Sequence, residues 1–189
     1  MTKLSKLFHV AAFGALAFCA LGLVGISQAS AQVACPANPH WTATVPPINA
    51  DHVFCGEVRA NGTAAGFHSR PGGVNPATVA NFVINQPANA NGVYGGNVTL
   101  VNPNGANPTK FSTMFPDSCT EAAVVQSILY AHANQVACPA GAPGWASCGL
   151  NRPDPAAGGH CVGDDATTRF YIAFGTLGNG NINTAFPLR

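Results

Sequence analysis

Apolar and polar positions alternate in a way that predicts strands early in the chain. Residues 53–59 and 65–69 flank an Asn-Gly step at 61–62, which favours a tight reversal between two strands. Residues 78–84 and 93–101 are rich in β-branched and aromatic side chains and are separated by Asn, Gly and Pro. We therefore expect regular structure to start near residue 52 and to be mainly β.

The end of the chain predicts a further hairpin. Residues 169–177 and 182–188 have the composition of strands, and a Gly-Asn-Gly-Asn sequence at 178–181 joins them. Side chains alternate between the two faces of a strand, so Thr184 and Phe186 are expected to lie on the same face.

One helix is predicted between these strands. Residues 118–121 fit the capping box S-x-x-E, and the helix should end before Pro139. Residues 138–165 are rich in Gly and Pro and hold three cysteines, so we expect a loop held by disulfides rather than a periodic element. The predicted apolar stripe of the helix consists of Val124, Val125, Ile128, Leu129 and Ala131 or His132.

The N-terminus has the pattern of a secretory signal peptide. Lys3 and Lys6 form a basic region, residues 7–26 are apolar, and small residues at 29–31 form a cleavage site. An uncleaved anchor is the alternative, because the apolar stretch approaches the length of a membrane span. After cleavage we expect a secreted or periplasmic protein without membrane contact. The expected parts are a signal peptide (1–31), an extended lead-in (32–50) and one domain (51–189).

The mature chain has the size of one domain and is nearly neutral. About 158 residues follow the expected cleavage site, enough to bury a sizeable core. Without Lys3 and Lys6, six arginines and lysines face seven acids, so the net charge is near −1. Nucleic-acid binders usually carry a basic patch. The composition therefore argues against such a binder but allows an enzyme that holds one or two nucleotides.

The cysteine count predicts disulfides. Removal of the signal peptide removes Cys19 and leaves an even set of six in an exported chain, which predicts up to three bridges and leaves fifteen connectivities open. No C-x-x-C pair is present, so a zinc site is disfavoured. The six candidates are Cys35, Cys55, Cys119, Cys138, Cys148 and Cys161.

Three side chains suit the cleavage of RNA without a metal. The mature chain has one lysine, Lys110, behind a loop at 102–108, and the Asn-Gly turn would bring His52 and His68 together. Two imidazoles can supply a base for the ribose 2′-hydroxyl and an acid for the leaving 5′-oxygen at neutral pH. An ammonium can stabilise the charge that grows on phosphorus. Taken singly, each of these residues more often has a structural role.

Four separated motifs resemble the bacterial branch of the EndoU endoribonuclease family. They occur in the family's order with family-like gaps and span nearly the whole mature domain. The motifs are HVFCGE at 52–57, GFHSRPGG at 66–73, KFSTMFPD at 110–117 and NTAFP at 183–187.

The resemblance implies an α+β ribonuclease fold with antiparallel sheets around the site and at least one flanking helix. It implies that His52, His68 and Lys110 form a catalytic trio and that Thr184 contacts the uracil edge. Phe186 stands where many members have a tyrosine; it keeps an aromatic face for stacking but lacks the hydroxyl, which affects base selectivity more than cleavage. No cofactor is implied as a requirement, although some members respond to manganese.

Other residues carry weaker signals. Ser69 and Arg70 follow His68 and are candidates for phosphate contacts, but the Arg-Pro-Gly-Gly sequence predicts a turn equally well. Cys119 stands where bacterial relatives often have an aromatic residue, which fits adaptation to an oxidising compartment. His132 and His160 are expected to be structural.

The sequence thus predicts an exported, monomeric endoribonuclease that cuts single-stranded RNA 3′ of uridine and leaves a 2′,3′-cyclic phosphate. It could serve as a toxin, with a cognate immunity protein as partner, or as a scavenger of external RNA. Two rivals remain: a secreted RNA- or protein-binding module that keeps the fold without activity, and a hydrolase of another phosphodiester such as DNA.

Overall fold

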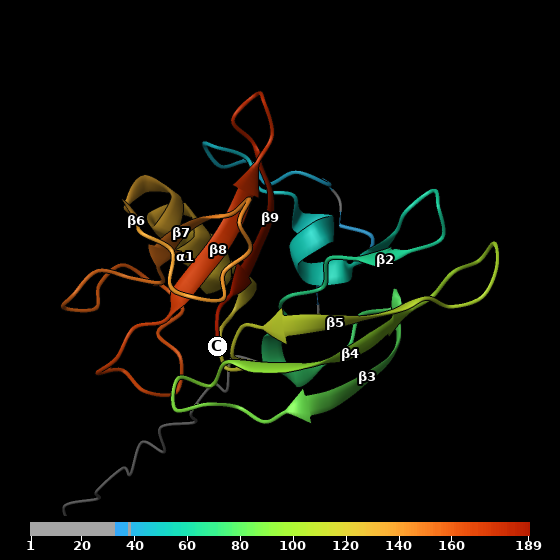
Figure 1. Ribbon diagram of the computed structural model, residues 1–189, viewed down its shortest axis with the longest axis horizontal. Coiled ribbons are helices and arrows are strands. Elements are labelled where there is room, and N and C mark those ends of the chain that lie inside the picture. Colours follow the sequence, from blue (N-terminus) through green and yellow to red (C-terminus); the bar gives the residue numbers. More distant parts are fainter. Residues whose placement is uncertain (1–32, 38) are drawn as a thin grey trace, which may run out of the picture.

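Two antiparallel sheets, of three and four strands, make up most of the fold and lie on either side of a short helical turn (Figure 1). This computed structural model describes residues 33–37 and 39–189. The signal peptide expected at 1–31 lies outside the described residues. The α+β class with antiparallel sheets and a flanking helix is confirmed.

The smaller of these sheets contains β3 (Val79–Gln86), β4 (Tyr94–Leu100) and β5 (Thr109–Met114) in that spatial order. The strands predicted at 78–84 and 93–101 are confirmed. Their inward side chains form a small core with Phe67, and its buried members are Phe67, Val79, Tyr94, Val98, Leu100 and Met114.

Strand β5 is not predicted by the alternation of residue types. One of its two buried positions is the polar Ser112, so the apolar alternation that marks a strand is incomplete. The expected loop at 102–108 is present. Lys110, however, lies inside β5, where it is paired with Val98 of β4.

A π-helical turn, η1 (Asp51–Cys55), replaces part of the strand predicted at 53–59. Val53, Phe54 and Cys55 are all buried, whereas consecutive side chains of a strand would point to opposite faces. The chain becomes extended only at β1 (Glu57–Val58), which pairs with β2 (Ala64–Ala65) across the Asn-Gly turn. The prediction of a turn was correct, and that of a strand starting at residue 53 was wrong.

The helix α1 (Glu121–Ala133) ends before Pro139 as predicted, but its cap differs. Thr120 is the N-cap, because its hydroxyl accepts from the amide of Ala123 at 3.2 Å. The predicted capping box starting at Ser118 is wrong. The Ser118 hydroxyl instead donates to Asp164 at 3.1 Å.

The four-stranded sheet contains β6 (Gln135–Val136), β7 (Ser147–Leu150), β8 (Tyr171–Thr176) and β9 (Ile182–Pro187), in that spatial order. The C-terminal hairpin is confirmed. The prediction that 138–165 has no periodic element is wrong, because β7 lies within it. Gly149 explains the difference: a Cβ there would lie 2.2 Å from the Ala131 carbonyl, so this strand packs directly on α1.

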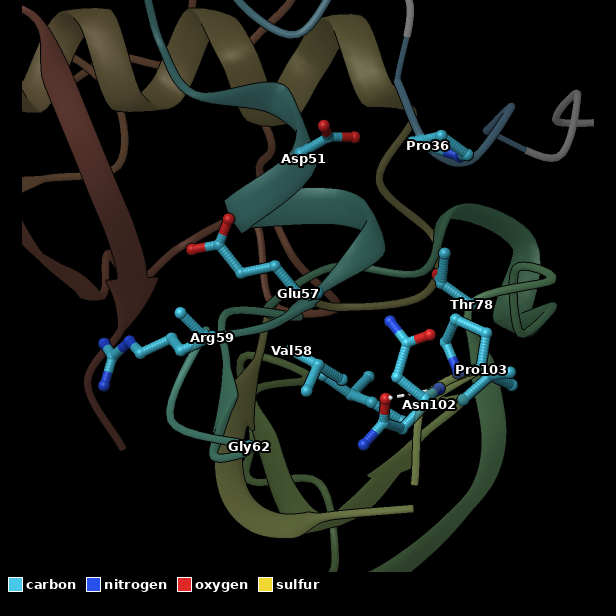
Figure 2. Close-up of a pocket in the computed structure, with 14 residues that line it drawn as sticks. Pro36, Asp51, Glu57, Val58, Arg59, Gly62, Thr78, Asn102 and Pro103 are labelled. Carbon is cyan, nitrogen blue, oxygen red and sulfur yellow. Dashed lines mark hydrogen bonds between the residues drawn. The ribbon is translucent and has the colours of Figure 1, made fainter. Parts of the chain in front are cut away.

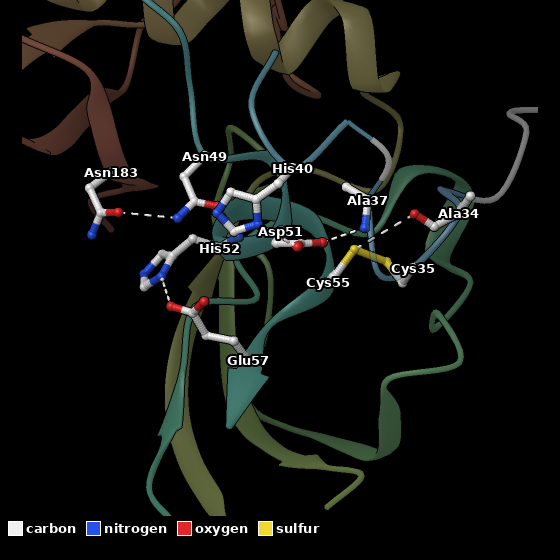
Figure 3. Close-up of polar contacts among 10 residues, drawn as sticks. All are labelled: Ala34, Cys35, Ala37, His40, Asn49, Asp51, His52, Cys55, Glu57 and Asn183. Carbon is white, nitrogen blue, oxygen red and sulfur yellow. Dashed lines mark hydrogen bonds and ion pairs between the residues drawn. A yellow bond between two sulfur atoms is a disulfide. The ribbon is translucent and has the colours of Figure 1, made fainter. Parts of the chain in front are cut away.

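All six cysteines of the described residues are paired, as predicted. The bridges join Cys35 to Cys55, Cys119 to Cys161 and Cys138 to Cys148. Three contacts attach the N-terminal segment to η1 (Figure 3). They are the first bridge, the ion pair of His40 with Asp51 at 2.6 Å, and the hydrogen bond from the Ala37 amide to Asp51.

The larger core lies between α1, the inner face of the four-stranded sheet and η1. It includes Val53 and Phe54 of η1, Ile128 of α1 and Ile172 of β8. Among the described residues, no helix has the length and apolar character needed to cross a membrane.

Candidate active site

The site begins at η1, which presents His52 at the junction of the two sheets. The Asn49 side chain accepts from the His52 amide at 3.0 Å and donates to Asn183 of β9 at 3.1 Å (Figure 3). The His52 backbone is thereby tied, through Asn49, to the strand that carries Thr184 and Phe186.

The backbone of η1 holds His68 beside His52. The His52 carbonyl accepts from the Phe67 amide at 2.7 Å, and the Val53 carbonyl accepts from His68 at 2.7 Å and Ser69 at 3.1 Å. This approach requires Gly66, because a Cβ at that residue would lie 2.3 Å from the His52 carbonyl oxygen. The two imidazole rings consequently lie with their centres 5.9 Å apart.

Each imidazole is oriented by a partner on Nδ1. His52 Nδ1 lies 2.8 Å from Glu57 Oε1, and His68 Nδ1 lies 3.0 Å from the Thr113 carbonyl oxygen of β5. A carboxylate and a carbonyl only accept hydrogen bonds, so Nδ1 carries the hydrogen in both rings. The Nε2 atoms are then left for a substrate.

The two histidines differ in charge environment. Burial lowers the pKa of His68 well below its usual 6.5, and the charges of Lys110 and His52 lower it further, against the opposite effect of the Thr113 hydrogen bond. His68 is therefore neutral at pH 7. The hydrogen bond from His52 lowers the pKa of Glu57, so this carboxylate is ionised beside the His52 ring.

Lys110 lies on β5, and its ammonium points toward the chain that leads into His68. Nζ donates to the Gly66 carbonyl at 3.0 Å and to the Ser112 hydroxyl at 2.6 Å, and that hydroxyl donates to the same carbonyl at 3.1 Å. An ammonium has three donors, so these two contacts leave one for a substrate oxygen. Burial, and then the charge of Arg59, lower the pKa of Lys110 to about 8.

Strand β9 adds an aromatic wall. The Phe186 ring lies 5.1 Å from the His68 ring, and Trp145 lies 6.1 Å from Phe186. Thr184 is opposite Gly175 of β8, two residues from Phe186 and on the same face. Its side chain is half-buried, so the hydroxyl is within reach of a ligand that packs on Phe186.

The structure does not bring Ser69 and Arg70 into this group in the way that it brings the histidines. Ser69 is buried, and its hydroxyl has no hydrogen-bond partner among the described residues. Arg70 donates to Tyr94 at 2.7 Å and to Asp117 at 3.0 Å, and its guanidinium lies 5.0 Å from the centre of the Phe82 ring. These contacts occupy Arg70 within the three-stranded sheet and its flanking loops.

Two pockets flank the site. One of about 530 Å³ lies between β1 and the loop at 101–104, but Glu57 and Arg59, which line it, point away from Asn102 (Figure 2). The other, of about 500 Å³, includes Thr113, whose carbonyl orients His68, together with Arg169. Neither histidine lines this second pocket, so Thr113 is its one link to the site described above.

Within the described part of the chain, no group of three or more His, Cys, Asp or Glu side chains could hold a metal ion. His132 packs on Phe174 and His160 on Tyr130, with ring centres 5.5 and 5.2 Å apart, so both are part of the packing around α1.

Three residues of the site were not singled out from the sequence. Glu57 orients His52, Arg59 lowers the Lys110 pKa, and Trp145 extends the aromatic wall. Glu57 belongs to the first motif, and its spacing of five residues from His52 is the signal that could have identified it. The position of Trp145 depends on the fold of the 138–148 loop and has no such signal.

The arrangement brings together a neutral imidazole, an imidazole paired with a carboxylate, an ammonium and an aromatic wall. A family model described as bacterial EndoU nuclease matches residues 48–189, which include every one of these groups. Neither the curated proteins nor the solved structures gave a significant match.

Proposed function

The chain belongs to the bacterial EndoU nuclease family, and on this basis we propose that it is an endoribonuclease that cuts single-stranded RNA 3′ of uridine. The observation that carries the proposal is the unequal pair of histidines: His68 is neutral and buried, whereas His52 is paired with an ionised carboxylate. A base and an acid poised in this way suit cleavage by the neighbouring 2′-hydroxyl.

In the proposed reaction His68 Nε2 removes the proton of the 2′-hydroxyl, and the 2′-oxygen attacks phosphorus. Lys110 stabilises the negative charge of the pentacoordinate phosphorus with its remaining N–H. His52 Nε2 gives its proton to the 5′-oxygen as the P–O bond breaks. The products are a 2′,3′-cyclic phosphate and a 5′-hydroxyl, and proton exchange with water restores both histidines.

Base recognition in the proposal rests on β9. The Thr184 hydroxyl would hydrogen-bond the edge of uracil, while the ring of Phe186 packs on the base or ribose. Phe186 lies 5.1 Å from His68, so a nucleoside packed on it has its ribose near the proposed base. Single-stranded RNA suits this arrangement, because an unpaired base can leave the stack and enter the pocket.

The proposal places the enzyme outside the cytoplasm. Three disulfides are typical of an oxidising compartment, and the N-terminal sequence has the pattern of an export signal. A toxin with a cognate immunity protein and a scavenger of external RNA both fit. Inspection of the adjacent reading frames for a small inhibitor gene distinguishes the two roles.

The test is cleavage of an oligonucleotide with one uridine, compared with the same strand carrying 2′-deoxyuridine, with and without EDTA. We expect one cut 3′ of uridine, a 2′,3′-cyclic phosphate end, no cut in the deoxy strand, and no loss of activity in EDTA. Purified His68→Ala protein controls for contaminating ribonuclease.

Each rival predicts a different result. A binding module without activity leaves both strands intact, and a nuclease that does not use the 2′-hydroxyl cuts the deoxy strand as well. A rate that EDTA abolishes and manganese restores would show that the reaction needs a metal in addition to these side chains.

A further inference from the structure

Trp145 is an exposed aromatic residue at the edge of the proposed site. Its side chain is 62% exposed, whereas Phe67 and Phe115 nearby in the fold are fully buried. Exposure of an indole forgoes the stabilisation that its burial would give. A ligand that covers the ring would recover this free energy.

The indole lies against the backbone of strand β8 at Gly175. A Cβ at Gly175 would lie 2.9 Å from the indole Cζ3 and 3.3 Å from Thr184 Cγ2. Gly175 is paired with Thr184, so the indole is beside the residue that is proposed to read uracil. Any side chain at position 175 would therefore displace the ring.

Trp145 continues a row of rings that starts at the catalytic centre. His68 and Phe186 lie 5.1 Å apart, and Phe186 and Trp145 lie 6.1 Å apart with their planes at 64°. A strand of RNA with its uridine on Phe186 would bring an adjacent base to the indole.

The loop that carries Trp145 is fixed at both ends. Cys138 and Cys148 join across a separation of ten residues, and Cys148 is paired with Ala173 in the sheet. Within the loop the Ala146 amide donates to the Pro143 carbonyl at 3.0 Å. The indole is thus held in place before a ligand arrives, which reduces the entropic cost of binding.

We propose that Trp145 is a stacking platform for the base of a nucleotide adjacent to the scissile uridine, so that the substrate extends beyond a single nucleotide. This inference rests on the proposed function. Stacking on an indole accepts any base and needs no cationic groove. It therefore suits a mature chain with a net charge near −1, in which Arg70 and Arg152 already donate to protein oxygens.

The first test compares two substrates. Trp145→Ala should lower kcat/KM roughly 5- to 150-fold for a trinucleotide with a central uridine, the range expected for loss of one stacked base. It should leave the cleavage of uridine 3′-(methyl phosphate) unchanged, because this ester has no ring beyond the scissile uridine. Trp41→Ala, a change in the N-terminal segment, is the matched control.

Two further measurements locate the effect. When the trinucleotide lacks the base on the side that Trp145 contacts, wild type and Trp145→Ala should have the same kcat/KM. When it lacks the base on the other side, the difference in kcat/KM between the two proteins should remain. Gly175→Ala should also reduce kcat/KM for the trinucleotide, because the added Cβ displaces the ring.

Binding gives a readout that does not depend on cleavage. In a Trp41→Phe background, a trinucleotide with central 2′-deoxyuridine should quench Trp145 fluorescence, and the matching abasic strand should not. If wild type fails to cleave RNA, the proposed function fails. If wild type cleaves RNA and Trp145→Ala cleaves the trinucleotide equally well, or loses as much on the methyl ester, only the stacking platform is disproved.

Discussion

Different forces stabilise the two parts of the molecule that meet at the site. The disulfide-bonded region, residues 33–55 and 118–189, includes α1, the four-stranded sheet and all three bridges. It supplies 16 of the 18 buried residues of the larger core. The three-stranded sheet has a core of six buried residues and no bridge. Its additional support is polar, because Arg70 joins Tyr94 of β4 to Asp117, which follows β5.

The proposed chemistry is divided along the same line. His52, Thr184 and Phe186 belong to the disulfide-bonded region, whereas Lys110 and the carbonyl that orients His68 belong to β5. The proposed general acid and the residues that recognise uracil therefore come from one region. The cation and the carbonyl that orients the proposed general base come from the other. Activity depends on the alignment of the two regions, and stability depends mainly on one of them.

The largest expected effect is on catalysis. His52→Ala, His68→Ala and Lys110→Ala should each lower kcat/KM on uridine-containing RNA on the order of 10²- to 10⁴-fold, because each removes a proton-transfer group or a charge at the phosphate. Circular dichroism should show that each variant is folded. His160→Ala, a change outside the site, is the control. A folded Lys110→Ala protein with nearly wild-type turnover would remove lysine from the mechanism.

The second prediction compares the two regions in stability. Replacing Cys119 and Cys161 by alanine opens the longest bridged loop, with a separation of 42 residues. The chain-entropy model predicts a loss of about 4 kcal/mol in the free energy of unfolding. Arg70→Leu, which breaks the polar contacts of the three-stranded sheet, should cost about 1–3 kcal/mol. Urea unfolding measures both, and a larger loss for Arg70→Leu would reverse the comparison.

The third prediction concerns base choice. Thr184→Val keeps the shape of the side chain but removes its hydroxyl, so preference for uridine should relax by about 1–3 kcal/mol, the value of one polar contact in a desolvated pocket. Phe186→Tyr should leave cleavage intact and alter selectivity only modestly. Cleavage of strands with a single U, C, A or G measures the effect. Unchanged preference in an active Thr184→Val protein would mean that uridine is read elsewhere.

The smallest expected effect is the pH dependence. His68 acts as a base only when neutral, and its pKa is lowered, so kcat/KM should fall with decreasing pH only well below 6.5. Lys110 must be charged and has a pKa of about 8, so kcat/KM should also fall as pH rises above about 8. Lys110→Arg keeps its charge there. If an active Lys110→Arg enzyme retained the alkaline fall, the proposed acid His52 rather than Lys110 would control it.

The sequence predicted those elements whose signal is local. The strands around β3, β4 and the C-terminal hairpin have β-branched residues and turn signals, and α1 has an apolar stripe. Strand β7 has no local signal, because its Ser-Cys-Gly-Leu sequence is extended only through contact with α1 and pairing with β8.

The site shows the same division. Both histidines and the lysine are identifiable because they are few in the chain and lie in motifs. Their unequal environments are not, since they depend on the contact of Gly66 with His52 and on the Thr113 carbonyl. The separate roles of the two histidines therefore become accessible only in three dimensions.

Those roles can be tested most directly with a substrate whose leaving 5′-oxygen is replaced by sulfur. A thiolate leaves without a proton, so the need for a general acid disappears while the need for a base at the 2′-hydroxyl remains. We predict that His52→Ala, slow on ordinary RNA, cleaves the 5′-thio substrate at nearly the wild-type rate, and that His68→Ala remains slow on both. Rescue of His68→Ala, with His52→Ala still slow, would contradict the assignment of base and acid.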